Sequence, residues 1–134
     1  MTERSKKKVS EVMSADFLVL DGLATVAEAL DLMRSHDASF ALIDKRDEHD
    51  EYGIVLVSDV AKQVLAKNRA PERVNVYEIM CKPVLCVQPG MNIRYCARLF
   101  ERFGISTAPV VEGEKILGVV TYDTLVLKGL ADDA

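Results

Sequence analysis

No stretch of the 134-residue sequence approaches the roughly 18 consecutive apolar residues that a membrane-spanning helix needs. The first ten residues, MTERSKKKVS, are basic and lack the apolar core of a secretory signal. From these two absences we expect a cytoplasmic protein with no membrane partner.

Metal-ligating side chains are also scarce. The three cysteines are odd in number and show no CxxC spacing, which argues against a disulfide framework and a zinc site. The two histidines, His36 and His49, have no ligand-type neighbour at helical spacing. The acidic segment 47–51 lacks the glycine and the spacing of a calcium loop. We therefore expect reduced thiols, a solvated acidic loop and no metal site.

Catalytic motifs are absent as well. The sequence contains no phosphate loop of the GxxxxGK[ST] kind and no Ser/His/Asp set in a recognisable context. We expect no enzyme activity, no catalytic residue and no required cofactor.

The charge is unevenly divided. Residues 1–8 hold four basic residues and one acidic residue, a net charge of +3. Because the whole chain has a net charge of −4, the remaining residues carry −7. A body of that sign is a poor nucleic-acid surface, and we expect no nucleic-acid partner. The basic segment is interpreted as a mobile tail. Binding of nucleic acid through that tail alone is the alternative, and it would depend steeply on salt concentration.

The sequence does contain a long internal repeat. VSEVM (Val9–Met13) recurs as VYEIM (Val76–Met80), 67 residues later. At that spacing FLVLD (17–21) aligns with VLCVQ (84–88), and both are typical of short buried strands.

An amphipathic helix follows in each copy. Apolar residues recur at i, i+3, i+4 and i+7 after Thr25, and again after Asn92. Both residues are good N-caps, and Thr25 forms a capping-box pattern with Glu28. Gly104 is suited to end the second helix.

A β-hairpin and a final helix complete each copy. SFALID (39–44) aligns with STAPVV (106–111), and both predict a strand. After connections that differ by two residues in length, Gly53 aligns with Gly118, now 65 residues apart. A final helix is predicted after each of these glycines, and Pro71 ends the first of them.

Each copy is too small to bury a stable core alone, so we expect the two copies to pack as a pseudo-two-fold pair. The predicted organisation is a basic mobile tail (1–8), a first repeat (9–65), a linker (66–75) and a second repeat (76–131).

The order of elements and the phrases VSEVM, TVAEALDLM, GIVLVSD, FGISTAPVV and GVVTYDT together resemble the CBS domain, the regulatory repeat first noted in cystathionine β-synthase. The resemblance implies an α/β fold: a CBS-domain pair of two pseudo-symmetric β-α-β-β-α repeats, each with a short leading helix.

The family often binds AMP, ADP, ATP or S-adenosylmethionine in clefts between its repeats. The resemblance implies that a strand containing proline reads the adenine, that a Thr or Ser approaches the phosphate, and that an Asp three residues later holds the ribose hydroxyls. The first copy has Asp59 but places Leu56 at the Thr position, and the second has Thr121 but places Thr124 at the Asp position. Neither copy is complete, so the resemblance implies two non-equivalent clefts.

Thirteen residues are candidates for binding this ligand. Phosphate needs a cation, and backbone groups and carboxylates suit an adenosine. The candidates are Phe17, Ser39, Phe40, Asp59, Lys82, Val84, Arg94, Ser106, Thr107, Pro109, Thr121, Asp123 and Thr124. A purely structural interpretation stays open for several of them: Asp59, Asp123 and Thr124 each stand where a helix needs a cap, and Arg94 stands on a solvated helix face.

The function that the resemblance implies is a stand-alone regulatory or sensing module. It would bind an adenosine-containing ligand, dimerise with a second copy through helix faces, and signal to an effector protein. The alternative is a ligand-free dimeric interaction scaffold whose clefts are vestigial.

Overall fold

The computed structural model describes residues 7–131. The expected basic tail therefore lies mostly outside the described residues, and only its last two residues can be compared with the structure. Both belong to the folded part: Lys8 forms an antiparallel bridge with Asn92, and the Lys7 ammonium donates to the carbonyl of Lys128 at 3.0 Å. The folded chain thus begins earlier than the sequence predicts.

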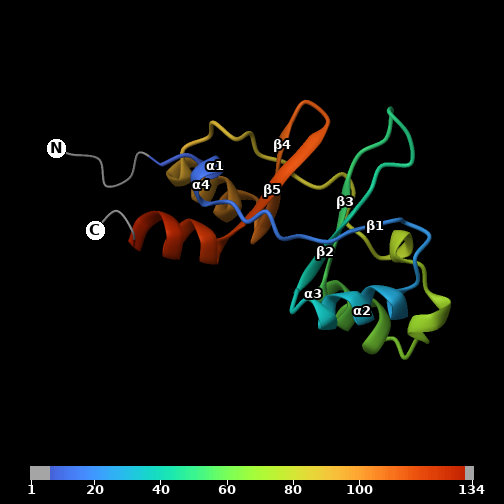
Figure 1. The fold of residues 1–134 in the computed structure, drawn as a ribbon. Helices are drawn as coiled ribbons and strands as arrows, with labels where there is room; N and C mark the ends of the chain where they lie inside the picture. Colours follow the sequence, from blue (N-terminus) through green and yellow to red (C-terminus); the bar gives the residue numbers. More distant parts are fainter. Residues whose placement is uncertain (1–6, 132–134) are drawn as a thin grey trace. The chain divides into compact units, whose positions relative to one another are not determined.

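The chain forms two compact units that do not follow its order in sequence (Figure 1). The central unit is Phe17–Val84. The terminal unit combines the described residues up to Asp16 with those from Leu85 onward. Across residues 7–131, no helix has the length and apolar character needed to cross a membrane.

The central unit has a three-stranded sheet in the order β1-β2-β3, formed by β1 (Val19–Leu20), β2 (Phe40–Ile43) and β3 (Gly53–Leu56). β1 is parallel to β2, and β3 is antiparallel to it. Helix α2 (Val26–Ser35) packs its buried apolar side against this sheet (Figure 1). The remaining elements are α3 (Val57–Val60), η1 (Ala61–Leu65), η2 (Pro71–Arg73) and η3 (Val76–Glu78).

The terminal unit has a two-stranded antiparallel sheet of β4 (Thr107–Glu112) and β5 (Lys115–Thr121). Helices α1 (Val9–Val12), α4 (Ile93–Phe103) and η4 (Thr124–Leu130) surround a core around the fully buried Phe100. Gly113 turns the hairpin with φ of 63°, and Gly104 ends α4 in the left-handed conformation, as the sequence predicts.

The leading segment of each repeat packs with the other repeat's hairpin. In the terminal unit, Ser14 and Val119 exchange both backbone hydrogen bonds, at 2.8 and 2.9 Å. In the central unit, their counterparts Cys81 and Ile54 do the same, at 2.9 and 3.0 Å. This reciprocal exchange explains why the units differ from the repeats read along the sequence.

The exchange also explains the two aligned glycines. A Cβ on Gly118 would lie 2.7 Å from the Ser14 carbonyl oxygen, and one on Gly53 would lie 2.9 Å from the sulfur of Met80. Both values are below ordinary contact distance, so a side chain at either position would have to displace part of the leading segment that crosses the strand.

One predicted strand is wrong. Residues 17–21 contain the two-residue strand β1, but residues 84–88 form only a single bridge, between Val87 and Val110. The reason is the second repeat's proline. Leu42 donates to the Leu18 carbonyl at 2.9 Å in the central unit, whereas its counterpart Pro109 has no N–H to donate.

The predicted final helix of each repeat is present, but most of it is a π-helix rather than an α-helix. Both η1 and η4 are π-helical, and the Ala66 amide donates to the Ala61 carbonyl at 2.9 Å. Hydrophobic spacing does not distinguish this winding from an α-helix, so the sequence predicted the helices but not their type.

Candidate ligand-binding site

Four candidate residues of the central unit gather at one end of its sheet. The antiparallel register pairs Phe40 with Leu56, and the Val57 amide donates to the Ser39 carbonyl at 3.0 Å, which ties the start of α3 to the start of β2. Continuing the parallel register of β1 by two residues places Phe17 level with Phe40. Asp59 lies in the first turn of α3, at the same end.

The Asp59 carboxylate has one structural role. Its Oδ2 accepts from the Leu56 amide at 2.8 Å, as the third helical residue of a capping box does. It is thus a capping residue within the helix rather than at its N-cap. Among the described residues Oδ1 has no hydrogen bond, so one carboxylate oxygen of a half-buried side chain is able to accept from a ligand.

The terminal unit brings three threonines together at the corresponding end of its hairpin. Thr107 is paired with Thr121 across β4 and β5. The Thr124 hydroxyl accepts from the Thr121 amide at 2.9 Å and donates to its carbonyl at 3.0 Å, while the Thr124 amide donates to the Thr121 hydroxyl at 3.3 Å. Both hydroxyls therefore help to start the final helix.

The other predicted residues of this hairpin differ in exposure. Pro109 is buried opposite Val119, and its carbonyl accepts from the Val87 amide at 3.0 Å. Ser106 is exposed just before β4. Asp123 is exposed, has helical backbone angles and caps nothing with its side chain, so its prediction as an N-cap is wrong. The cap of that helix is Thr121, two residues earlier.

Lys82 and Val84 lie at the opposite end of the central sheet from Asp59. The Val84 amide donates to the carbonyl of Tyr52, directly before β3. Leu56, at the end of β3, lies four residues after Tyr52, a distance of roughly 13 Å. The central unit by itself therefore does not bring Lys82 to the Asp59 end.

Lys82 is engaged by a residue that the sequence analysis missed. Its ammonium lies 2.5 Å from Oδ1 of Asp50, in the loop between β2 and β3. The hydrogen bonds from Lys82 and from the Arg46 backbone hold the pKa of the Asp50 carboxyl well below its ordinary value. The opposite charges in the long loop could have signalled an ion pair, but the sequence gives no indication that Lys82 lies beside it.

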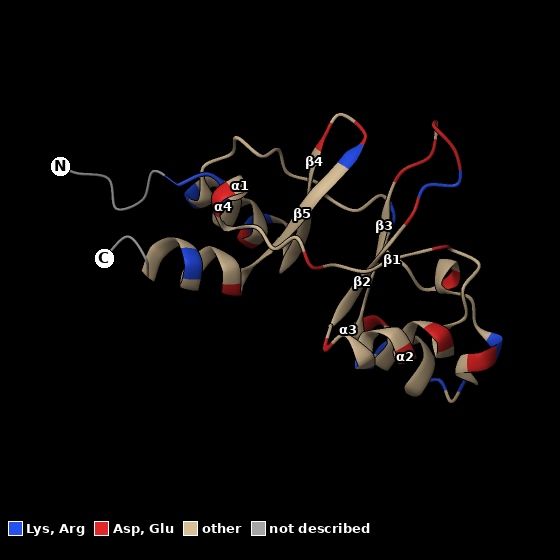
Figure 2. Cartoon of the chain, in the orientation of Figure 1, with Lys and Arg blue, Asp and Glu red and all other residues tan. Residues whose placement is uncertain are grey.

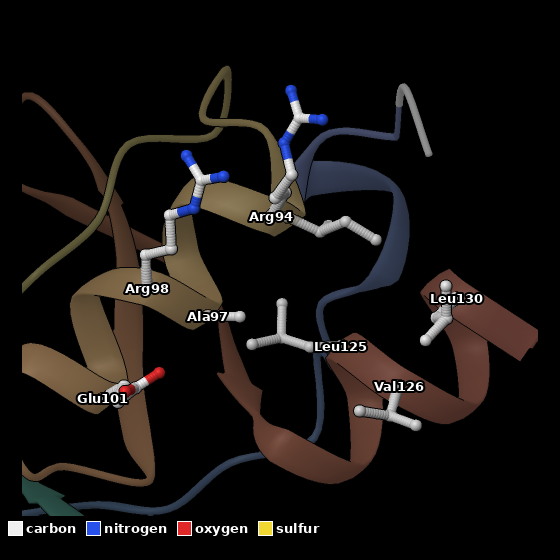
Figure 3. Close-up of a pocket in the computed structure, with 8 residues that line it drawn as sticks. Arg94, Ala97, Arg98, Glu101, Leu125, Val126 and Leu130 are labelled. Carbon is white, nitrogen blue, oxygen red and sulfur yellow. The ribbon is translucent and has the colours of Figure 1, made fainter. Parts of the chain in front are cut away.

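Arg94 lines a different feature, a groove of about 310 Å³ between α4 and η4 (Figure 3). Its apolar lining comes from Ile93 and Ala97 on α4 and from Leu125, Val126 and Leu130 on η4, and Arg98 and Glu101 complete it. The Arg94 and Arg98 side chains both extend from α4, and each guanidinium lies 5.5 Å from the ring centre of Tyr95. Neither Thr107 nor Thr121 lines this groove.

No cluster of three or more His, Cys, Asp or Glu side chains able to hold a metal ion occurs within residues 7–131.

Comparison with known families gives two matches to the CBS domain, over residues 9–66 and 76–129, which together cover most of the sequence. The chain belongs to the CBS domain family. Its mixed α/β fold is that of a CBS pair: a hexameric CBS-CP12 protein from bloom-forming cyanobacteria is 35% identical and superposes with a TM-score of 0.88, covering 91% of this chain and 67% of that one.

A second solved structure shares the fold at lower identity. The CBS domain pair of protein MJ0100, in complex with 5′-methylthioadenosine and S-adenosyl-L-methionine, is 24% identical with a TM-score of 0.78 and covers 91% of this chain and 98% of that one.

Among proteins compared by sequence, this CBS pair is 24% identical over 110 residues to an uncharacterized Methanocaldococcus jannaschii protein, covering 81% of this chain and 59% of that protein. It is 30% identical over 120 residues to homoserine O-acetyltransferase of Methanocorpusculum labreanum, covering 89% of this chain and 23% of the enzyme. The chain thus spans little more than half of the first relative and less than a quarter of the second.

Proposed function

We propose that this CBS pair is a regulatory module that binds an adenosine-containing ligand, AMP, ADP, ATP or S-adenosylmethionine, and passes the signal to an effector protein. Membership of the CBS family supports a regulatory role, and the complex of the MJ0100 pair with two adenosine compounds supports the ligand class.

The observation that carries the proposal for this chain is the Asp59 carboxylate. One oxygen is used by the Leu56 amide, and the other has no hydrogen bond among the described residues. A carboxylate in that state can accept a charge-assisted hydrogen bond from a ribose hydroxyl. The backbone around Ser39 and Phe40 lies at the same end of the sheet, which supports a role for it in recognising an adenine edge.

Ligand binding is tested by thermal unfolding of the chain with AMP, ATP, S-adenosylmethionine and NAD. A ligand present at 100 times its Kd adds about 2.7 kcal/mol to the free energy of unfolding, which raises the Tm by roughly 8 °C for a domain of this size. We expect such a shift with at least one adenosine compound. No shift with any of the four would contradict the proposal.

The second candidate function is a dimeric interaction scaffold without a ligand. The observation in its favour is that Thr121 and Thr124 already satisfy each other and the helix start, so their hydroxyls have structural roles that need no ligand. Apolar side chains are also exposed along η4, with Val126, Leu127 and Leu130 at 47%, 63% and 49% exposure.

Both candidates include a homodimer through the helix faces. The groove between α4 and η4 has an apolar lining that a second copy would cover. Sedimentation of the chain and of a variant of a groove residue, Val126→Glu, tests this. We propose a dimer that the charged side chain dissociates, and a monomeric parent chain would contradict it.

A further inference from the structure

The loop between β2 and β3 holds an acidic side chain against two cations. Asp50 is only 9% exposed, although the residues around it at the tip of the loop are open to solvent. Its Oδ1 meets the Lys82 ammonium, and its Oδ2 accepts from the Arg46 backbone amide at 2.8 Å and from the Arg46 Nε at 3.2 Å. Every oxygen of the carboxylate thus faces a donor of positive or partial positive charge.

The loop is otherwise held by interactions of its own. The Asp50 amide donates to the Asp47 carbonyl at 3.2 Å, the His49 amide donates to the Asp47 carboxylate at 2.8 Å, and the Lys45 ammonium lies 5.0 Å from the ring centre of Tyr52. Figure 2 shows that acidic and basic residues both occur along this loop. Because these bonds do not involve Lys82, the loop can keep its local form when Asp50 leaves Lys82.

Among residues 7–16 and 85–131, the terminal unit has no equivalent of this arrangement. Its β4–β5 connection is a tight turn through Gly113, and the counterpart of Lys82 in the first repeat is Ala15. The ion pair belongs to one repeat alone, so the pseudo-symmetric fold does not require it.

Lys82 and Arg46 are the kinds of residue that form an oxoanion-binding site, and the Asp50 carboxylate occupies the position of the anion. An ammonium and a guanidinium converging on one carboxylate are the donors that also bind a phosphate group, which carries more charge and more acceptor oxygens than a carboxylate. We propose that Asp50 is an internal, exchangeable occupant of a phosphate-binding site formed by Lys82 and Arg46, and that a phosphate-bearing ligand binds there by displacing it. The β2–β3 loop would then report occupancy by releasing Lys82. Lys82 lies at the opposite end of the central sheet from Asp59, so this site is separate from the proposed adenosine site and does not rest on the proposed function.

The test uses the whole chain and four variants. Asp50→Asn removes the internal anion, Lys82→Gln and Arg46→Gln each remove a cation, and Glu48→Gln is the matched control, because it removes one negative charge from the exposed tip of the same loop. Melting curves first establish that each variant is folded. Arg46 is 81% exposed, so its variant keeps the test available if Asp50→Asn unfolds.

The first measurement follows the amide NMR signals of residues 46–50 and 82 while inorganic phosphate is added. We expect Asp50→Asn to respond at about three- to fivefold lower phosphate concentration than the parent chain, in keeping with the loss of one partly exposed ion pair. Glu48→Gln should match the parent, Arg46→Gln should respond more weakly, and Lys82→Gln should not respond. An equal response in Asp50→Asn and Glu48→Gln, or an unchanged response in Lys82→Gln, would overturn the proposal.

The second measurement compares inorganic phosphate with adenosine by calorimetry. Lys82 lies at the opposite end of the central sheet from Asp59, so an adenosine held at Asp59 does not reach it. We expect Asp50→Asn to gain affinity for phosphate by the same factor and to leave adenosine binding unchanged. An equal gain for both compounds would overturn the exchange. If adenosine binds no variant while phosphate still responds through Lys82, the proposed function fails and the oxoanion site stands.

Discussion

The two units follow the same plan but fill their cores differently. Fully buried Phe100 of the terminal unit corresponds to Met33 of the central unit, and Phe100 also packs edge-on against Tyr122, with ring centres 5.3 Å apart. Behind the first helix, Val26 and Val64 in the central unit are replaced by Ile93 and Gly129. The extra methyl group of isoleucine reaches the space over the glycine, so the larger side chain partly compensates for the smaller one.

The same comparison shows which differences alter the candidate sites. In the terminal unit Pro109 stands at the position of Leu42 and lacks the amide that would donate to the neighbouring strand. The counterpart of β1 is therefore reduced to the single bridge between Val87 and Val110. In the terminal unit Thr124 stands at the position of Asp59. It accepts the same hydrogen bond from the amide three residues earlier, but it has no carboxylate. Structural and ligand-binding roles therefore separate at this position: both residues cap a helix, and only the aspartate offers a charged acceptor.

The largest difference between the units is expected from truncating their cores. Phe100→Ala should lower the free energy of unfolding by about 3–5 kcal/mol, because it leaves a large cavity and removes the aromatic contact. Met33→Ala should cost less, about 2–3 kcal/mol, because the thioether is smaller and its surroundings adapt. Urea unfolding measures both. Equal losses would show that the terminal core does not depend on the aromatic pair.

The two crossing glycines should differ by a smaller amount. Gly118→Ala directs a methyl group at the Ser14 backbone, which cannot move alone, so we expect a cost of about 2–3 kcal/mol. Gly53→Ala meets the flexible Met80 side chain first and should cost about 1 kcal/mol. Urea unfolding of the two variants decides the order, and a larger cost at Gly53 would contradict the packing described for the leading segments.

The packing of Ile93 over Gly129 can be tested by substitutions that make the terminal unit resemble the central unit. A Cβ on Gly129 would lie 2.5 Å from Cδ1 of Ile93. Gly129→Ala alone should therefore lower the free energy of unfolding by about 1 kcal/mol or leave it unchanged. Combined with Ile93→Val, which removes that methyl group, it should recover the stability that alanine normally gives over glycine in a helix. A double-mutant cycle measures the coupling, and additive effects would mean that the two side chains do not share the space.

The smallest effect concerns a thiol. Burial raises the pKa of Cys96 to about 11, and its counterpart Ala29 is equally buried. Cys96→Ala should change stability by about 1 kcal/mol or less at neutral pH. The folded state holds the thiol proton more tightly than the unfolded state, so the parent chain should lose stability as the pH rises from about 9 to about 11, and the variant should lose less. Unfolding curves across that range check the difference, and identical profiles would contradict the burial effect.

Much of the fold could be predicted from the sequence because its signals are local. Thr25 and Asn92 begin α2 and α4 as expected, accepting from the amides of Glu28 and Arg94 at 3.1 and 2.8 Å. The hairpins and the repeat spacing follow from the aligned apolar segments 39–44 and 106–111 and from the aligned glycines. The composition of the compact units could not be predicted, because the reciprocal packing of leading segments depends on contacts between residues far apart in sequence.

The candidate site was harder to predict than the fold. The resemblance selected Asp59, Thr121 and Thr124. A capping role was predicted for Asp59 and Thr124 and is confirmed, whereas capping by Thr121 was not predicted. Asp50 was missed because a loop of mixed charges is usually solvated, and its partner Lys82 lies about thirty residues along the chain. Arg94 was selected for its charge, and the structure places it in the groove between α4 and η4.

The central claim is that two units of one plan offer non-equivalent sites, of which the one with Asp59 binds an adenosine compound. Calorimetric titration of the chain with the ligand that raises its Tm tests this most directly, alongside the Asp59→Ala and Thr124→Ala variants. The account predicts one ligand per chain, lost in Asp59→Ala and retained in Thr124→Ala. Two ligands bound with equal affinity, or binding that survives Asp59→Ala, would contradict it.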